Sequence, residues 1–245
     1  MEPLVEIKNL SIRFPEGNST FEAVKGISFS IGKGEIVGVV GESGSGKSMS
    51  ALALMGLLPK DAEIASGSLC FQGEDLVTMK PEKRRQLCGS KMAMVFQEPM
   101  TSLNPVLKIE RQVGESLRIH TKLGNAEIHE RVVQALSEVG LPDPEGLCGK
   151  YPHELSGGMR QRVMIAQAMI NSPSLLIADE PTTALDCVVQ AQILELLRNI
   201  HRIKGTSILF ISHDLNVVRA LCSRVIVVYK GEIVEEGQTE DVLLH

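Results

Sequence analysis

The sequence predicts an α/β fold with a small antiparallel β-region at its start and a helical segment inserted in its middle. From Gly157 onward, apolar strand-like runs alternate with helical stretches, which is typical of a mostly parallel sheet covered by helices. Residues 4–36 instead show strand-like alternation around a turn-forming cluster, Pro15–Ser19. Strand signals vanish between Ile109 and Gly158, where apolar residues recur at helical spacing.

The individual elements follow in chain order. In the first half we expect strands over residues 5–12, 24–31, 35–40, 67–71 and 91–96, with helices over 49–58, closed by Pro59, and 81–87. In the inserted segment one helix face carries apolar residues that we interpret as core packing, namely Ile128, Val132, Leu136 and Val139. In the second half we expect strands over 174–179, 206–212 and 223–229, with helices ending at 170 and spanning 188–202 and 214–221.

Composition and charge exclude several classes of protein. The net charge of −5 and the absence of a basic block argue against a nucleic-acid surface as the main function. The longest apolar runs, such as Val225–Tyr229, are far shorter than the ~20 residues that a membrane-spanning helix needs, and Met1–Glu6 lacks the features of a signal peptide. The five scattered cysteines show no C-x-x-C pattern, so we expect reduced, mostly buried thiols in a cytoplasmic protein.

Residues Gly41–Ser48 read Gly-Glu-Ser-Gly-Ser-Gly-Lys-Ser, which is the P-loop spacing G-x-x-x-x-G-K-[ST]. The run follows an expected strand and opens an expected helix. In that context the glycines let backbone N–H groups surround a polyphosphate at the positive end of the helix dipole. Lys47 would reach the β- and γ-phosphates, and the Ser48 hydroxyl would ligate Mg²⁺. A flexible glycine turn beside an exposed lysine is the alternative, and the strand–helix context favours nucleotide binding by Gly41, Ser43, Gly44, Ser45, Gly46, Lys47, Ser48 and Met49.

Two acids end the apolar run Ser174–Glu180. An apolar strand would place Asp179 and Glu180 at its carboxyl end, where ligands of parallel sheets bind. Asp179 could hold Mg²⁺, usually through a water, and Glu180 could orient and deprotonate an attacking water. Alternatively, the two acids merely open the turn at Pro181. A P-loop in the same chain favours the chemical role.

A second glycine-containing helix start lies at Leu155–Gln161, which reads Leu-Ser-Gly-Gly-Met-Arg-Gln. Ser156 is a plausible N-cap, and Gly157 and Gly158 leave backbone N–H groups bare at the positive helix end. Taken alone, this is a serine N-cap. Beside a P-loop it resembles a second phosphate-binding surface, although one chain cannot easily fold both surfaces onto a single phosphate.

Together these motifs resemble the ATPase subunit of ABC transporters. The matching set, in the family's order and spacing from residue 4 to about 245, is Gly41–Ser48, Gln97, Leu155–Gln161, Leu175–Glu180, Ala184–Asp186 and His213. The resemblance implies a P-loop NTPase (RecA-like) core with an N-terminal antiparallel β-subdomain and an inserted α-helical subdomain. It implies one ABC ATPase domain over 1–245, divided into 1–96 with the β-subdomain and P-loop, a helical signature subdomain over 97–162, and the rest of the core over 163–245.

The resemblance also implies ATP and Mg²⁺ as cofactors and a head-to-tail pairing of two such subunits. Ser156, Gly157 and Gly158 of one chain would then contact the γ-phosphate held by the other chain's P-loop, with Gln161 among the nucleotide contacts. Hydrolysis would remove the phosphate that bridges the two chains, so that closure and opening follow the phosphate chemistry. Asp186 would lie at the dimer interface and help to position the catalytic groups.

Three further residues receive roles from the same resemblance. Gln97 would reach Mg²⁺ and the attacking water, or simply end a strand. His213 would hydrogen-bond the γ-phosphate and hold Glu180 and the water in line, or be an ordinary loop histidine. Phe14 would stack on adenine, although it could equally pack in the core, and Phe21 is its rival.

The segments Phe96–Pro105 and Met55–Pro59 resemble the peptide/nickel subfamily of ABC importers, and within it the D-type ATPase. The implied partners are a second ABC ATPase (a related F-type chain, with a homodimer in isolation), two membrane permease subunits and an extracytoplasmic substrate-binding protein. Residues 104–109 and the helices after them would form the groove for the membrane subunit's coupling helix. The chain would sit peripherally on the cytoplasmic face of the membrane, and members often continue past the position of His245.

The substrate is open between peptides, nickel and metal chelates, because it never touches this subunit. We therefore interpret four histidines as surface or packing residues rather than nickel ligands: His120, His129, His153 and His201. Two alternative functions remain, a soluble ABC ATPase acting on nucleic acid or in cluster assembly, and the ATPase of a separate-chain exporter. Neither a basic face nor tandem modules support the first alternative.

Overall fold

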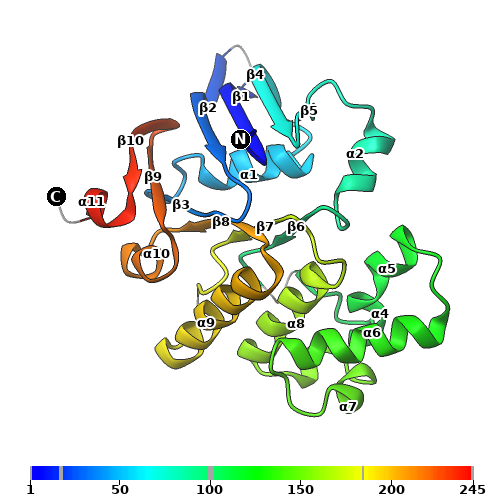
Figure 1. Ribbon diagram of the computed structural model, residues 1–245. Helices are drawn as coiled ribbons and strands as arrows, with labels where there is room; N and C mark the ends of the chain where they lie inside the picture. The colour runs from blue at the N-terminus through cyan, green and yellow to red at the C-terminus, as the bar shows by residue number, and fades with distance from the viewer. Residues whose placement is uncertain (1, 17–18, 99–101, 184, 244–245) are drawn as a thin grey trace. The chain divides into compact units, whose positions relative to one another are not determined.

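The computed structural model describes residues 2–16, 19–98, 102–183 and 185–243, and the chain forms two compact units (Figure 1). Unit 1 comprises Met1–Arg85 and Gly205–His245, and unit 2 comprises Gln86–Lys204. Unit 1 therefore holds the P-loop, whereas unit 2 holds both the acidic strand end at Asp179 and the helix start at Ser156. No helix in the described ranges is both long enough and apolar enough to cross a bilayer.

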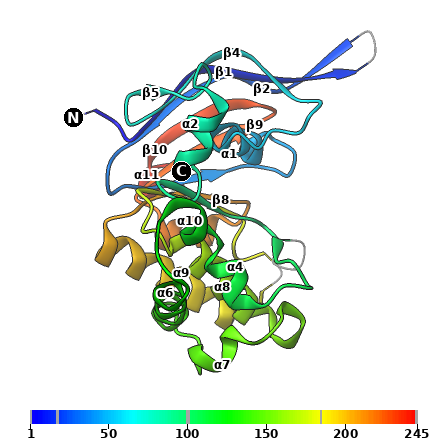
Figure 2. The same cartoon turned by 90° about the vertical axis from the view of Figure 1, so that its right-hand side faces the viewer.

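The predicted antiparallel region of unit 1 is confirmed. It forms a four-stranded sheet in the order β2 (Ser19–Ile31), β1 (Val5–Glu16), β4 (Glu63–Phe71) and β5 (Glu74–Asp75), whose three long strands run side by side in Figures 1 and 2. Along β1 the buried positions change phase, from Val5 and Ile7 to Leu10 and Ile12. The register shifts between Ile7 and Leu10, where Asn9 adopts φ 48°. This bulge keeps both halves of the strand facing the core.

A second set of strands in unit 1 carries the P-loop. Strand β3 (Ile36–Val40) is buried throughout and lies parallel to both β8 (Ser207–Ser212) and β9 (Arg224–Tyr229). Such a continuous apolar run is expected for a parallel strand covered on both faces. Strand β10 (Glu232–Gln238) pairs antiparallel with β9 and is followed by α11 (Thr239–Leu243). Neither of these last two elements was predicted from the sequence. Strand β10 reads Glu-Ile-Val-Glu-Glu-Gly-Gln, so its apolar residues do not alternate with polar ones.

Besides α11, unit 1 has the helices α1 (Lys47–Met55), α2 (Pro81–Leu87), whose last two residues belong to unit 2, and α10 (Leu215–Leu221). The prediction that α1 runs to Leu58 and is closed by Pro59 was wrong. Gly56 ends it instead, with φ 70°, and the N–H groups of Gly56 and Leu57 donate to the carbonyls of Ala53 and Leu52. This is the Schellman pattern, in which a glycine in the left-handed region closes the helix.

Unit 2 combines one parallel strand pair with helices. Strands β6 (Met92–Val95) and β7 (Leu175–Asp179) are parallel neighbours, and β6 ends before Phe96, which is 39% exposed, so that the predicted strand over 91–96 is too long. The helices are α4 (Ile109–Val113), α5 (Glu115–His120), α6 (Asn125–Glu138), α7 (Pro144–Cys148), α8 (Gly157–Met169) and α9 (Cys187–Lys204), with a 3₁₀ turn at Pro152–Glu154.

The predicted apolar stripe of the inserted segment lies on α6. Ile128, Val132 and Leu136 are at most 2% exposed, and Val139 just after the helix is also buried. Helix α6 packs against α4, α7 and α8 within unit 2. Core packing is therefore confirmed as the role of the stripe.

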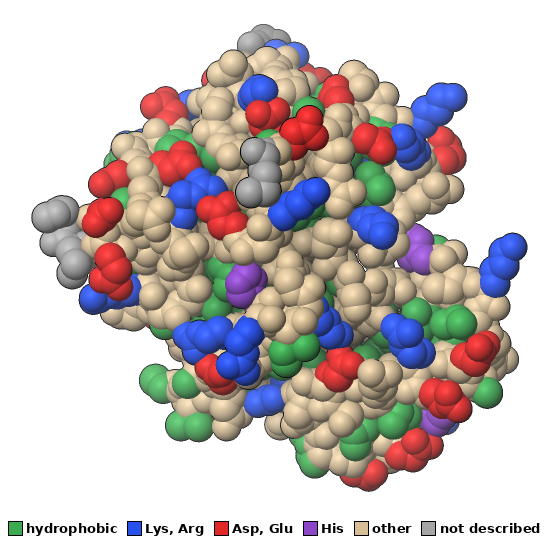
Figure 3. Space-filling model, viewed as in Figure 1, with side chains coloured by type: hydrophobic (Ala, Val, Ile, Leu, Met, Phe, Trp, Pro, Cys, Tyr) green, Lys and Arg blue, Asp and Glu red, His purple; other side chains and the backbone are tan. Residues whose placement is uncertain are grey.

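On the face of the molecule shown in Figure 3, acidic and basic side chains are interspersed rather than gathered by sign.

Candidate nucleotide-binding and hydrolysis residues

The P-loop connects β3 to α1 through a backbone that only glycine can follow at its two ends. Gly41 has φ 152°, and a Cβ there would lie 2.0 Å from the Val228 carbonyl oxygen. Gly46 has φ 98°, and a Cβ there would lie 2.4 Å from the Ala23 carbonyl oxygen. Both distances are far inside van der Waals contact, so any larger residue would push the loop open. Gly44, with φ 78°, lies at the exposed part of the loop beside Ser43.

The polar groups of the loop face inward. Lys47 is only 5% exposed, and its ammonium donates to the carbonyls of Gly41 at 2.8 Å and Glu42 at 2.7 Å. The Ser45 hydroxyl is buried and has no hydrogen-bond partner among the residues that the structure describes. Helix α1 has no side-chain cap, because its N-cap is Gly46. A buried cation, an orphaned hydroxyl and uncapped N–H groups at a helix start form a cradle that fits a polyphosphate. Ser48 and Met49 follow in the first turn and are half-buried.

His213 lies at the same end of the unit 1 sheet as the P-loop. Val40, the last residue of β3, pairs with Ser212, the last residue of β8, in a parallel register. The next residues along the two strands are Gly41 and His213, and the His213 side chain is exposed. The structure thus brings His213 and the P-loop together at one sheet edge, as the position of a ligand in a parallel sheet requires.

The two rival aromatic residues are partners. Phe14 and Phe21 lie opposite each other on β1 and β2, with ring centroids 6.5 Å apart and planes tilted by 37°. Phe14 is half-buried, whereas Phe21 is 51% exposed. The two rings form one aromatic surface on the antiparallel sheet, in which Phe14 is the more buried ring and Phe21 the more exposed one. Stacking of Phe14 on adenine stays a prediction.

Unit 2 holds the acidic strand end. Strand β7 is buried throughout, Asp179 is 7% exposed, and Glu180 follows it with φ 47°. The left-handed region costs a non-glycine residue roughly 1–2 kcal/mol. Glu180 is therefore held in a strained backbone at the position that sequence reasoning assigned to the general base, and strain of this kind clusters at active sites.

Two donors converge on one oxygen of Glu180. Gln97 Nε2 donates to Glu180 Oε2 at 2.9 Å, and Thr183 Oγ1 donates to the same oxygen at 2.9 Å. Gln97 reaches this point because it follows β6, whose Val95 pairs with Ala178 of β7. Sequence reasoning named Gln97 and Glu180 separately and missed Thr183. The only signal for Thr183 was its position three residues after the glutamate, within reach of a turn.

The helix start at Ser156 has the predicted N-cap geometry. Ser156 Oγ accepts a hydrogen bond from the Met159 N–H at 3.3 Å, and both Ser156 and Gly157 are exposed. Among the described residues, a Cβ at Gly157 would meet nothing within 4 Å, whereas one at Gly158 would meet Val189 Cγ1 at 2.8 Å. Packing within the chain therefore explains the glycine at 158 and leaves the one at 157 unexplained. Gln161, one turn further, is 1% exposed, and its buried Nε2 has no hydrogen-bond partner in the described part of the chain.

Asp186 caps helix α9. Its Oδ1 accepts hydrogen bonds from the N–H groups of Val188 at 3.0 Å and Val189 at 2.9 Å, and the side chain is exposed. This is an ordinary N-cap, and its predicted place at a dimer interface stays a prediction. The motif Ala184–Asp186 is described from Leu185 on, because residue 184 lies outside the described ranges.

The five cysteines are free thiols, of which Cys148 and Cys222 are buried. Burial raises the pKa of Cys222 to about 12, and burial together with nearby carboxylates raises the pKa of Cys148 to about 11. Thiols with raised pKa values are poor nucleophiles, so these two are packing residues. Cys187 is exposed and Cys70 and Cys88 are half-buried, which corrects the expectation of mostly buried thiols.

Comparison with known proteins decides the family. The model of the ABC transporter family matches residues 24–183. The chain belongs to the ABC transporter family. Its motif-based assignment is thereby confirmed, and the chain is an ABC-type ATPase cassette.

Curated ABC proteins match nearly the whole chain. It is 51% identical to the peptidoglycan transport ATP-binding protein YejF of Agrobacterium fabrum, over 98% of this chain and 44% of that protein. It is 47% identical to the dipeptide transport ATP-binding protein DppD of Haemophilus influenzae, over 98% of this chain and 72% of that protein. It is 45% identical to the oligopeptide transport ATP-binding protein OppD of Bacillus subtilis, over 98% and 67%. The chain thus spans less than half of the first relative and about seven-tenths of the other two.

Solved structures confirm the predicted fold class. The ABC cassette MJ0796, solved as a dimer in a post-hydrolysis state bound to ADP and Pi, has a TM-score of 0.86 at 28% identity, covering 96% of this chain and 98% of that one. The ABC transporter subunit cbiO1 of Clostridium perfringens has a TM-score of 0.83 at 28% identity, covering 100% and 92%. The P-loop NTPase fold with its antiparallel β-subdomain is therefore established.

Proposed function

We propose that this ABC ATPase powers the uptake of peptides through a membrane importer. The observation that carries the proposal is the near-complete match of the chain, at 45–47% identity, to proteins named for dipeptide and oligopeptide transport. The hydrolytic residues support it, because Glu180 is present and held by two donors. Nickel and metal chelates, the other cargoes that the subfamily resemblance implies, have no such support.

The chain's own groups divide the hydrolytic work. Lys47 and the N–H groups at the start of α1 bind the phosphates, and Phe14 contacts the adenine. Ser48, Gln97 and Asp179 offer hydroxyl, amide and carboxylate oxygens, which are the hard ligands that Mg²⁺ prefers. Bound there, the ion would neutralise charge that develops on the phosphates. Glu180 takes the proton of the attacking water, and His213 holds the water and the γ-phosphate in line.

A second ABC ATPase completes each site in this proposal. The exposed Ser156 and Gly157 contact the γ-phosphate bound by the partner. This contact would explain why position 157 is a glycine, which packing within the chain does not explain. The dimeric state of the related cassette MJ0796 supports such a pairing. Asp186 lies at this interface, and Gln161, one turn further along α8, supports the start of that helix. The partner is a related F-type chain, or a second copy when this chain is isolated.

The transport partners follow from the same proposal. Two permease subunits form the path through the bilayer, a binding protein outside delivers the substrate, and this chain associates peripherally with the cytoplasmic face. The motif Phe96–Pro105, on which the subfamily assignment rests, is described only in part, since residues 99–101 lie outside the described ranges.

Uptake measured in cells tests the proposal. A strain lacking this chain should lose uptake of labelled di- and oligopeptides, and the wild-type chain should restore it while Lys47→Ala should not. Nickel and a metal chelate serve as parallel substrates. If the chain restored nickel uptake but not peptide uptake, nickel rather than peptides would be the cargo. If Lys47→Ala restored uptake, the P-loop would not be required for transport.

A further inference from the structure

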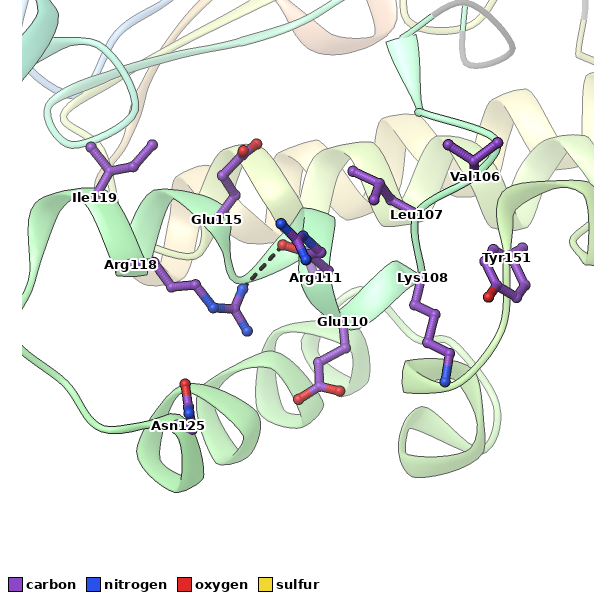
Figure 4. A pocket seen from close by; sticks show the side chains of 10 residues that line it. All are labelled: Val106, Leu107, Lys108, Glu110, Arg111, Glu115, Arg118, Ile119, Asn125 and Tyr151. Atoms are coloured by element: carbon purple, nitrogen blue, oxygen red, sulfur yellow. Dashed lines mark hydrogen bonds between the residues drawn. The ribbon is translucent and has the colours of Figure 1, made fainter.

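The groove in unit 2 that Figure 4 shows, lined among others by Leu107 and Arg111, lies where the subfamily resemblance expects the membrane subunit. It is therefore part of the proposed function. A contact in unit 1 has no role so far: the turn between β9 and β10, which come late in the chain, touches the P-loop.

This turn is a two-residue hairpin loop. Tyr229, the last residue of β9, pairs with Glu232, the first residue of β10. Between them, Lys230 has φ 48° and Gly231 has φ 88°. Two central residues with positive φ define a type I′ turn, in which glycine is favoured. A Cβ on Gly231 would also lie 2.9 Å from the Ala23 carbonyl oxygen of β2, so this position has no room for a larger residue.

The hairpin holds the P-loop at both of its ends. At the first end, the Val228 carbonyl oxygen of β9 lies so close to Gly41 that a Cβ there would be 2.0 Å from it. At the second end, the Gly231 N–H donates to the Ser45 carbonyl oxygen at 3.0 Å. The Gly231 carbonyl in turn accepts a hydrogen bond from the Lys25 N–H of β2 at 2.8 Å. Gly231 therefore joins the P-loop to the antiparallel sheet through its two backbone groups.

The hydrogen bond to Ser45 determines how the Ser45–Gly46 peptide is oriented. This peptide is trans, and in a trans peptide the C=O and N–H groups point in opposite directions. Because the Ser45 carbonyl points at Gly231, the Gly46 N–H points away from the hairpin. Gly46 is the N-cap of α1, and its N–H donates to no other described residue. It is thus one of the N–H groups that a helix start offers to an anion.

Without a partner for the Ser45 carbonyl, this orientation would be easily lost. Gly46 has φ 98°, and glycine adopts positive and negative φ about equally readily. The peptide between the two residues can therefore turn over at little cost. A turned peptide would direct the carbonyl oxygen, which carries a partial negative charge, at the place where the N–H meets the phosphates.

We infer that Gly231 is a positioning residue for phosphate binding, because its N–H holds the Ser45–Gly46 peptide in the orientation that directs the Gly46 N–H at the phosphates. That the P-loop binds phosphates rests on the proposed function. The part played by the β9–β10 turn goes beyond it. If the peptide turns over in a fraction of the molecules, the apparent affinity for nucleotide falls by that fraction.

The test removes the N–H of Gly231 and nothing else. Glycolic acid, incorporated in place of Gly231 in the full chain, converts the amide into an ester that has no hydrogen to donate. A backbone hydrogen bond makes a net contribution small enough that Mg-ATP should bind about fivefold more weakly. The kcat at saturating ATP should be retained, because the water and its base are not altered. Inorganic tripolyphosphate should lose affinity by the same factor as ATP, since the contact concerns the phosphates and not the base.

The turn between β4 and β5 provides the matched control. Phe71 pairs with Glu74 across it, and its central residues Gln72 and Gly73 have φ 52° and 79°, so it is also a type I′ turn. Among the described residues, a Cβ at Gly73 would meet nothing within 4 Å, and the Gly73 N–H donates to none of them. Glycolic acid at Gly73 should therefore leave the affinities for ATP and tripolyphosphate unchanged.

A second pair of variants gives the same comparison by ordinary mutagenesis. Gly231→Ala places a Cβ against the Ala23 carbonyl and moves the turn, so that ATP affinity should fall further than with the ester. Gly73→Ala has a similar backbone strain without that contact and should bind ATP as the wild type does.

Three results would overturn the inference. A merely structural hydrogen bond would lower the melting temperature of the Gly231 ester and leave its ATP affinity unchanged. Equal losses of affinity in the Gly231 and Gly73 variants would assign the effect to hairpin stability. Loss of ATP affinity with unchanged tripolyphosphate affinity would show that Gly231 acts through the sheet that carries Phe14. A wild-type ATP affinity of Lys47→Ala would instead remove the phosphate assignment of the P-loop, on which the inference rests.

Discussion

Replacing Thr183 by Val removes one of the two donors that hold Glu180. The change keeps the branched shape of the half-buried side chain and deletes only its hydroxyl, which lies 2.9 Å from Glu180 Oε2. Gln97 Nε2, also at 2.9 Å, stays in place. The backbone of Glu180 is in the left-handed region, so its side chain depends on these partners for its direction.

The magnitude follows from the charge on the acceptor. A hydrogen bond to a charged group contributes about 1.5–3 kcal/mol, and one such bond remains from Gln97. If half or more of that contribution serves to aim the carboxylate at the water, kcat should fall by about tenfold, because each 1.4 kcal/mol is a factor of ten. The KM for ATP should stay constant, since the hydrogen bond that Thr183 donates goes to the general base and not to the nucleotide.

A steady-state ATPase assay against ATP concentration separates the two constants. Thr183→Ser keeps the hydroxyl and is the matched control, with a kcat close to that of the wild type. An unchanged kcat in Thr183→Val would show that Gln97 alone positions Glu180. A raised KM with unchanged kcat would show that Thr183 acts on nucleotide binding, and the reasoning from the Glu180 contact would fail.

Four other variants probe the same machinery. Glu180→Gln should keep ATP binding, lower turnover by at least 100-fold and accumulate a closed dimer in ATP, as size-exclusion chromatography would detect; rapid turnover would identify another group as the base. Ser156→Arg should bind nucleotide normally as a monomer and lose ATPase activity, and full activity would rule out a contribution from a second chain. Gly158→Ala should lower stability by about 1–3 kcal/mol because its Cβ would meet Val189 Cγ1 at 2.8 Å, while Gly157→Ala should leave thermal unfolding unchanged. Equal melting temperatures for the two glycine variants would contradict that contact.

The motifs and most elements were predictable because their signals are local. The P-loop spacing, the apolar run before Asp179 and the helical stripe on α6 each lie within a few turns of chain, where periodicity determines the structure. The elements that were missed or misplaced lack such a signal. Strand β10 has no apolar alternation, and the end of α1 depended on the backbone angle of Gly56 rather than on the proline after it.

The sequence by itself determined the family and the order of most elements, because residue type and spacing carry both, and it named the residues that we propose for the chemistry. Only the tertiary structure decided which of those residues meet. Gln97 and Thr183 share one oxygen of Glu180, although Gln97 is 83 residues away from it in the sequence. His129 joins Glu110 to Glu145, although Glu110 is 19 residues away from it in the sequence. Hydrogen bonds between side chains extend only about 3 Å, so such meetings depend on how strands and helices pack, and no local pattern records them.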